Sequence, residues 1–289
     1  MNQNHVRQIL ADHRLAPSKQ LGQNFLIQPR IATQIVEAAG VTPDDTVVEL
    51  GVGLGALTAP LAARAGQVIG LELDAGIIKY HREAQDLAAN VRLLHQDLLR
   101  ADFSAMAREQ GQKLKIIANL PYSITNPLLF KLLEHHPALE WAVLMIQREV
   151  AKRLTAKPNS KEYGVLTVLL ESCATVERLL LVGPGNFYPR PKVDSVVIRI
   201  RFLPQEESGT APRNLAMLRR VVDAAFGQRR KTLLNSLGCG KLPGLNRIGA
   251  GRVLEAAAIS PKLRAENLTT ADYLRLTGII ADLIREANV

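Results

Sequence analysis

Three glycines at alternate positions form the most distinctive motif of the sequence. Gly51, Gly53 and Gly55 lie in the stretch V-E-L-G-V-G-L-G-A-L-T, where an apolar strand pattern gives way to a helical one. Glycines in such a turn let a ligand approach the bare backbone at the start of a helix. With Ala56 the motif also satisfies the G-x-G-x-x-A form of a dinucleotide site. The motif therefore predicts an adenosine cofactor of either kind, and its alternative is a glycine-rich turn without a ligand.

Two carboxylates follow the next two strand patterns. Glu72 lies about 20 residues beyond Gly51, where an acid accepts hydrogen bonds from both ribose hydroxyls of an adenosine cofactor. Asp97 follows the third strand pattern, where it can accept from an adenine amine or act as a helix N-cap. These positions fit a dinucleotide as well as any other adenosine cofactor.

A tetrapeptide after the fourth strand pattern separates these possibilities. Asn119, Leu120, Pro121 and Tyr122 place an amide, a proline and an aromatic ring there, which a dehydrogenase does not need. The exocyclic amine of adenine is a poor nucleophile because its lone pair is delocalised into the ring. Two carbonyls, one from the Asn119 side chain and one from the Leu120 backbone, can accept its two protons in hydrogen bonds. These bonds localise the lone pair and aim it at a sulfonium methyl group. Pro121 stiffens the loop and Tyr122 offers a face for a flipped base, whereas the alternative is a plain strand-to-helix turn.

The elements that must position these residues are short apolar runs that alternate with helical patterns. This alternation predicts an α/β fold with a mostly parallel sheet covered on both faces. Two later β-rich stretches are separated by a Gly/Pro-rich turn and are expected to close one edge of the sheet. The expected strands cover residues 46–50, 67–71, 91–95, 114–118, 142–146, 173–182 and 193–202.

A change of pattern near residue 203 predicts two domains. Residues 203–213 combine prolines, a glycine and small polar residues, and everything after them favours helices. We therefore expect a Rossmann-like, seven-stranded domain over 1–203 and a small all-α domain over 204–289.

Charge and cysteine content limit the class of protein. The net charge is +9, and residues 204–289 hold 13 Lys or Arg against 8 Asp or Glu, which suits a polyanionic partner. Cys173 and Cys239 have no C-x-x-C spacing, so neither a metal site nor a disulfide framework is expected. No signal peptide and no run of 18 apolar residues is found, so a cytoplasmic protein without a membrane segment is expected.

With these residues placed, the chain resembles the ribosomal RNA adenine dimethyltransferase family, and its bacterial members from about residue 19 to 276. Besides Asp97, Tyr163 and Gly164, the shared blocks are L-G-Q-N-F-L at 21–26, the glycine stretch at 49–58, E-L-D at 72–74, N-L-P-Y at 119–122, Q-R-E-V-A at 147–151, F-Y-P-R-P-K-V-D-S at 187–195 and A-F-G-Q-R-R-K-T at 225–232. One departure is Val52, where the family usually has proline. It removes no ligand-contacting group.

The resemblance implies a class I methyltransferase that uses S-adenosylmethionine. Asn24 and Leu26 would border the methionine end of the cofactor. The remaining cofactor contacts that we expect come from Gly51, Gly53, Gly55, Glu72, Asp97 and Asn119. Phe187 resembles the family aromatic that stacks on the target base opposite Tyr122, and its alternative is a core phenylalanine.

The resemblance also implies the substrate. The family transfers two methyl groups to each of two adjacent adenosines in the loop of the 3′-terminal hairpin of 16S rRNA, in a late 30S assembly intermediate. We expect Arg229, Arg230 and Lys231 on a helix whose apolar side includes Leu218 and Val221. These three residues would face phosphates, and the alternative is that they form a solvated helix end. No metal is implied, and a monomer is expected.

Two other classes of protein compete with this interpretation. A DNA adenine methyltransferase would be expected to carry a DNA-reading domain, and the helical tail has no recognisable helix-turn-helix or zinc finger. A binding protein that kept the fold without catalysis would be expected to have lost Glu72, Asp97 or the Asn119 motif, all of which are present.

Overall fold

The computed structural model describes residues 2–15, 17, 22–204, 214–240, 242 and 244–286. The chain forms two compact units, of which the first comprises Met1–Ala151 and Val176–Phe202. The second comprises Leu203–Val289 and also Lys152–Thr175, which the sequence had placed with the first domain. The reason is that α8 (Val165–Glu171) packs against two C-terminal helices, α9 (Leu215–Phe226) and α12 (Thr270–Glu286). Most of the segment expected at the boundary, 205–213, lies outside the described residues.

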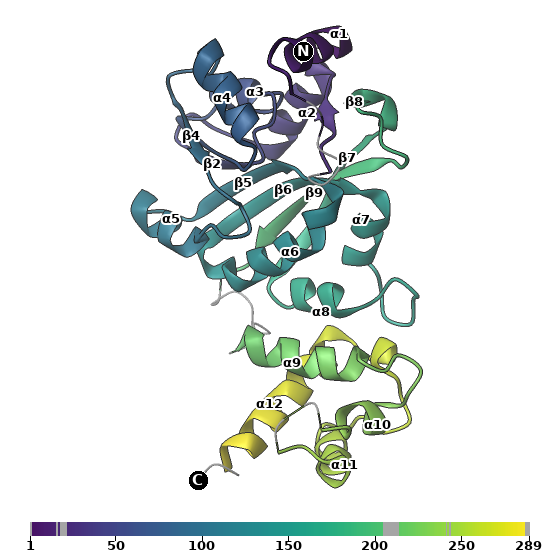
Figure 1. Ribbon diagram of the computed structural model, residues 1–289. Coiled ribbons are helices and arrows are strands. Elements are labelled where there is room, and N and C mark those ends of the chain that lie inside the picture. Colours follow the sequence, from purple (N-terminus) through teal and green to yellow (C-terminus); the bar gives the residue numbers. More distant parts are fainter. Residues whose placement is uncertain are drawn as a thin grey trace. The chain divides into compact units, whose positions relative to one another are not determined.

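A seven-stranded sheet in the order β4-β3-β2-β5-β6-β9-β7 organises the first unit (Figure 1). Strands β2 to β6 pair in parallel, and β9 pairs antiparallel with β6. The expected mostly parallel α/β fold is confirmed. The strands are β2 (Thr46–Leu50), β3 (Gln67–Glu72), β4 (Val91–His95), β5 (Leu114–Asn119), β6 (Leu139–Gln147), β7 (Ala174–Val182) and β9 (Ser195–Phe202).

Helices cover both faces of this sheet. Figure 1 shows α2 (Pro29–Ala39), α3 (Thr58–Ala62) and α4 (Ala75–Ala84) on one face and α6 (Thr125–Glu134) on the other. The remaining helices of this unit are α1 (Gln3–Asp12), α5 (Phe103–Gln110) and the first part of α7 (Arg148–Leu154), which continues into the second unit after Ala151. Neighbouring parallel strands bring their carboxyl ends to one edge, and the chain reverses its order beside β2. An α/β sheet binds ligands at such a point.

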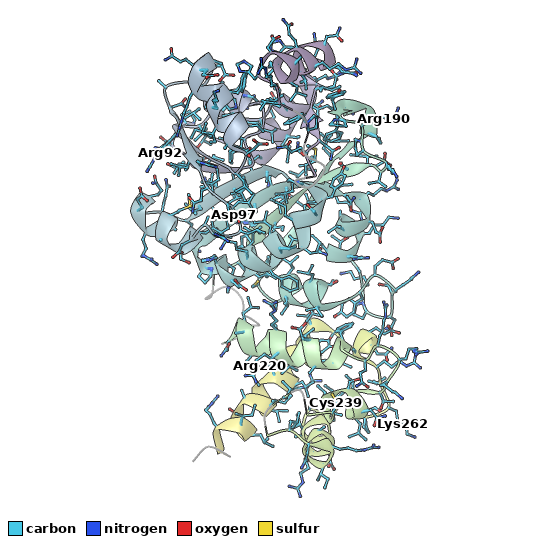
Figure 2. The ribbon with its side chains drawn as sticks, in the orientation of Figure 1. Arg92, Asp97, Arg190, Arg220, Cys239 and Lys262 are labelled. Carbon is cyan, nitrogen blue, oxygen red and sulfur yellow. The ribbon has the colours of Figure 1, made fainter. Side chains whose placement is uncertain are left out.

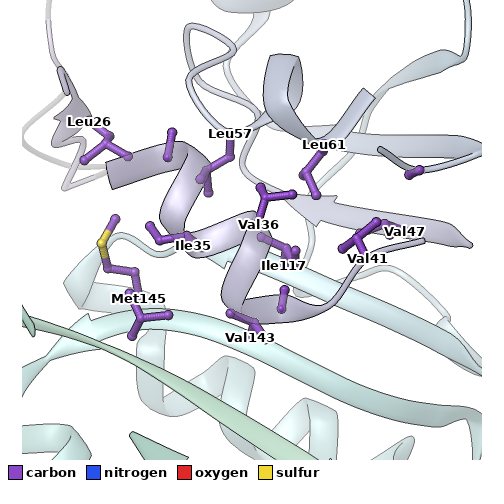
Figure 3. Close-up of a cluster of buried hydrophobic side chains, with 14 of the residues drawn as sticks. Leu26, Ile35, Val36, Val41, Val47, Leu57, Leu61, Ile117, Val143 and Met145 are labelled. Carbon is purple, nitrogen blue, oxygen red and sulfur yellow. The ribbon is translucent and has the colours of Figure 1, made fainter. Parts of the chain in front are cut away.

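Helix α2 shows how the sequence builds this core. Pro29 occupies its first turn, and the helix ends at Ala39, before Gly40, whose backbone is in the left-handed region. Its buried residues are Ala32, Ile35, Val36 and Ala39, which share one helix face. Ile35 and Val36 join a cluster with residues of β2, β5 and β6 (Figure 3). Each such side chain contributes about 1.5–3 kcal/mol on full burial.

A small second sheet was not expected from the sequence. Strands β1 (Phe25–Leu26) and β8 (Phe187–Tyr188) pair antiparallel, with Phe25 opposite Tyr188 and Leu26 opposite Phe187. Helix α1 packs its buried face, Val6, Ile9 and Leu10, into the same cluster as Phe25. The β1–β8 pair therefore ties the segment before α2 to the Gly/Pro-rich turn.

Helices and turns dominate the second unit over residues 214–240, 242 and 244–286, with one isolated bridge between Cys239 and Asn246. Its helices are α8, α9 (Leu215–Phe226), α10 (Leu233–Leu237), α11 (Arg247–Ala256) and α12 (Thr270–Glu286). Tyr273 of α12 is fully buried and donates to the Ala265 carbonyl at 2.7 Å. Throughout the described residues, none of the helices combines the length and apolar character needed to cross a membrane.

Candidate cofactor and amine site

A cavity of about 320 Å³ lies at the carboxyl ends of β2, β3 and β5, which is the size of a small-molecule site. The structure brings nine of the expected site residues to its walls. They are Asn24, Leu26, Gly51, Gly53, Glu72, Asp97, Asn119, Leu120 and Pro121. Gly55, Tyr122 and Phe187 are not among the residues that line the cavity.

The glycine loop owes its shape to left-handed backbone at all three glycines. Gly51 has a φ of 81° and Gly53 a φ of 55°, where other residues are strained. The Gly51 N–H donates to the Leu71 carbonyl at 2.8 Å, which anchors the loop on β3. Val52 is buried, and its Cγ2 lies 2.5 Å from the position that a Cβ on Gly70 would take. The residue that departs from the family proline therefore fits against a glycine of β3.

Glu72 is held at the floor of the cavity by three backbone N–H groups. Its Oε1 accepts from Leu73 and Asp74 at 2.8 Å each, and its Oε2 accepts from Gly53 at 2.9 Å. A carboxylate has about four lone-pair sites, so acceptor capacity remains for a ligand hydroxyl. The arrangement links the end of β3 to the glycine loop.

Asp97 lies two residues beyond the end of β4 (Figure 2). Its Oδ1 accepts from the Leu99 N–H at 2.9 Å, and its Oδ2 lies 3.7 Å from Arg100 Nε. It closes a turn and does not cap a helix, since α5 begins at Phe103 with Asp102 as its N-cap. Asp97 can offer a hydrogen-bond acceptor to a flat ring in the cavity, and the half-exposed Leu73 can offer that ring an apolar surface.

The Asn119 side chain is oriented by a bond to the segment before α2. Its Nδ2 donates to the Asn24 carbonyl at 3.1 Å. This bond uses only the amide nitrogen of Asn119. Because Asn119 also lines the cavity, its side-chain oxygen can accept a hydrogen bond from another donor there. The Leu120 N–H donates to Met145 on β6, which holds the peptide that follows.

The two aromatic residues have different environments. Tyr122 is half-buried in a 3-10 turn, and its hydroxyl bonds with Ser195 Oγ at 3.0 Å. Burial raises the pKa of Tyr122, against a lowering by Ser195. Phe187 is 4% exposed and belongs to the core cluster with Leu26 and Met145. The structure thus places Phe187 in the core, which was the alternative from the sequence, and its stacking role stays a prediction.

Glu49 also lines the cavity, and it is not among the site residues that we expected from the sequence. It is 1% exposed, and its Oε2 has no hydrogen-bond partner among the described residues. Burial and then the charge of Glu72 raise its pKa to about 8, partly offset by the Thr58 hydroxyl. The available signal was an acid inside an otherwise apolar strand, two residues before the first glycine.

The prediction that the basic cluster of residues 229–231 lies on a helix is wrong. Arg229, Arg230 and Lys231 do not lie on a helix, because α9 ends at Phe226 and a turn begins at Gly227, a residue that disfavours helix. All three are exposed, but the Arg229 guanidinium is paired with Glu266 at 3.2 Å and donates to the Lys161 carbonyl at 2.6 Å. The apolar side of α9 is buried as expected.

Comparison with known proteins decides the family. The model of the family described as "Ribosomal RNA adenine dimethylase" matches residues 15–282. The chain belongs to the ribosomal RNA adenine dimethylase family. It is 47% identical over 281 residues to "Ribosomal RNA small subunit methyltransferase A" of Desulfotalea psychrophila, covering 95% of each chain, and 42% identical to that of Pelotomaculum thermopropionicum, covering 96% of each.

Solved structures agree with the family assignment. A dimethyladenosine transferase from Plasmodium falciparum superposes with a TM-score of 0.73 at 27% identity, covering 87% of this chain and 95% of that one. The 23S rRNA methyltransferase ErmE gives 0.63 at 26% identity, covering 89% and 100%. The expected family, fold class and activity as an rRNA adenine methyltransferase are confirmed.

Proposed function

We propose that this chain uses S-adenosylmethionine to dimethylate two adjacent adenosines in the loop of the 3′-terminal hairpin of 16S rRNA, within a late 30S assembly intermediate. The observation that carries the proposal is the meeting of Asn119 with the glycine loop and Glu72 in one cavity. A carbonyl that can accept from an amine lies beside an adenosine-type site there. The curated relatives named for small-subunit methylation support the choice of rRNA.

The walls of the cavity fit each part of this cofactor. Glu72 accepts from the ribose hydroxyls, and Asp97 accepts from the adenine amine next to Leu73. The glycine loop, Asn24 and Leu26 border the methionine end. When bound, the cofactor supplies a methyl group on a sulfonium centre.

Glu49 adds a buried acid that suits the ammonium group of the methionine end. Its unpaired Oε2 and its raised pKa mean that it lacks a cation. An ammonium group beside it would favour the carboxylate form, and so bind more tightly there than a neutral group.

The target amine is oriented by acceptors and needs no base. The Asn119 side-chain carbonyl and the Leu120 backbone carbonyl take its two protons as hydrogen bonds and direct its lone pair at the methyl group. Tyr122, fixed by its bond to Ser195, stacks on the base from one side. After transfer the aryl ammonium is strongly acidic and loses its proton to water.

The second unit carries exposed basic residues that can bind the polyanionic rRNA. Arg230 and Lys231 are exposed beside the paired Arg229, and they can neutralise phosphates of the rRNA. We further propose that the protein acts as a monomer in the cytoplasm, where assembling subunits are present.

Labelled cofactor and undermethylated small subunits test this function. The wild type should place four methyl groups on each 16S rRNA, as two dimethyladenosines, with Asn119→Ala as the inactive control. Label in 23S rRNA, label in another nucleoside, or no transfer at all would contradict the proposal. Nucleoside analysis by mass spectrometry distinguishes these results.

A further inference from the structure

Both peptide groups that flank the α-carbon of Gly53 are held by buried side chains. The N–H group donates to Glu72 Oε2 at 2.9 Å, and the carbonyl oxygen accepts from His81 Nε2 at 2.8 Å. Because these bonds lie on the two sides of one α-carbon, together they fix its φ and ψ. The left-handed turn of the glycine loop is therefore imposed by the protein itself.

The His81 side chain is fully buried on the inner face of α4. Its Nδ1 lies 2.7 Å from Oδ1 of Asp86, whose Oδ2 accepts from the Tyr80 hydroxyl at 2.9 Å. A peptide carbonyl only accepts, so the bond to Gly53 requires that Nε2 of His81 is the donor. Asp86 thus turns the ring so that Nε2 points at the loop.

The same ring packs against a second glycine. A Cβ on Gly55 would lie 3.4 Å from Cε1 of His81, and a Cβ on Gly53 would lie 3.5 Å from the Phe25 ring. Leu54, between these glycines, is 2% exposed and packs with Tyr80. Helix α4 therefore holds the loop through apolar contacts and through one directed hydrogen bond.

We propose that His81, oriented by Asp86, is a positioning residue for the cofactor. His81 does not line the cavity within the described part of the chain, so it acts through Gly53. By holding the Gly53 carbonyl, it keeps the neighbouring N–H on Glu72 and the Glu72 carboxylate in place for the ribose. This inference rests on the proposed use of S-adenosylmethionine.

The first test replaces His81 with leucine or glutamine. His81→Leu keeps an apolar side chain but removes the donor to the Gly53 carbonyl, and it should weaken binding of S-adenosylhomocysteine about 10- to 100-fold by calorimetry. The KM for S-adenosylmethionine should rise in parallel, with kcat at saturation changed less than about twofold. His81→Gln can still donate to Gly53 and should recover a large part of the affinity.

Variants of the neighbouring acids provide matched controls. Asp86→Asn should weaken cofactor binding through His81, whereas Tyr80→Phe, which removes the other partner of Asp86, should not. Glu83→Gln removes an exposed carboxylate of the same helix that pairs with Lys79 and His13, and should leave affinity unchanged. Asp86→Asn also serves if His81→Leu fails to fold, since the Asp86 side chain is 34% exposed.

Amide hydrogen exchange of the cofactor-free protein gives a readout independent of activity. Peptides containing residues 51–55 should exchange faster in His81→Leu and in Asp86→Asn than in the wild type, with β2 unaffected. Folded variants with unchanged affinity and unchanged loop exchange would reduce His81 to a core residue. If the wild type binds no cofactor, the proposed function fails, and the exchange comparison still decides whether His81 positions the loop.

Discussion

The Asn119 side chain donates a hydrogen bond to the Asn24 carbonyl at 3.1 Å. This bond joins the end of β5 to the segment that precedes α2, a separation of 95 residues. It decides which end of the amide is used inside the protein and which end is left for a substrate. An amide satisfies both requirements, because it has one donor group and one acceptor.

Asn119→Asp should therefore lower the rate of methylation nearly as much as Asn119→Ala does. A carboxylate cannot donate to the Asn24 carbonyl, and the two oxygens would repel each other. Loss of one preorganised hydrogen-bond donor from an oxyanion hole lowers kcat about 10²- to 10³-fold, and by analogy we expect both variants in that range. Single-turnover methylation of small subunits measures this, and an aspartate variant with wild-type rate would show that the bond to Asn24 is unnecessary.

Glu72→Ala should weaken binding of S-adenosylmethionine by about 1.5–3 kcal/mol. The substitution removes the acceptor for the ribose hydroxyls and also the partner of the Gly53 N–H. Glu72→Gln keeps an acceptor and should lose less. Calorimetry on variants with a wild-type melting profile tests this, and equal affinity in all three proteins would remove Glu72 from the site.

Glu49 should make the protein less stable as pH rises. Its pKa is raised to about 8 in the folded protein from 4.5, so the folded state holds a proton that the unfolded chain releases. The stabilisation is complete below pH 4.5 and is lost as pH rises to about 8. Across this range the wild type should lose on the order of a few kcal/mol relative to Glu49→Gln. Urea unfolding at several pH values measures this, and parallel curves for the two proteins would contradict it.

Much of the fold could be predicted because each of the seven strands of the sheet has at least five residues and is rich in Val, Ile or Leu. The site could be predicted at Gly51, Glu72 and Asn119 because each lies at the carboxyl end of a strand or directly after it, and parallel strands end at one edge. These positions follow from local pattern and general topology alone.

The rest depends on contacts between distant segments. Strands β1 and β8 have two residues each, too few for any periodicity, and they form only because α1 and the core cluster bring them together. Glu49 was missed because its chemistry arises from burial and not from its residue type. The helix expected at Arg229 was extended too far because Gly227 follows the apolar face of α9 without interrupting its pattern.

Arg230 and Lys231 should account for most of the salt dependence contributed by the basic cluster. Replacing both with alanine should reduce the salt slope of subunit binding by roughly 2 units while cofactor binding is unchanged. Arg229→Ala should reduce the slope less, since its guanidinium is already paired with Glu266. Titrations at several salt concentrations compare the variants, and an unchanged slope in the double variant would mean that the cluster is only solvated surface.

The order of the two methylations tests the role of Phe187. After the first transfer the target amine keeps one proton, so one of the two acceptors, at Asn119 or Leu120, has lost its partner. Stacking must then hold the base, and each aromatic face can contribute about 1–3 kcal/mol.

Phe187→Leu should therefore slow the second methylation more than the first, whereas Asn119→Ala should suppress both. Leucine is the sharper substitution, because Phe187 is 4% exposed in the core and alanine would leave a cavity costing about 3–5 kcal/mol. Met145→Leu, in the same core cluster, is the matched control for a loss of packing without loss of a ring. A time course of mono- and dimethyladenosine by mass spectrometry separates the steps. If Phe187→Leu slows both steps equally, or behaves like Met145→Leu, then Phe187 only packs the core and Tyr122 holds the monomethylated base without it.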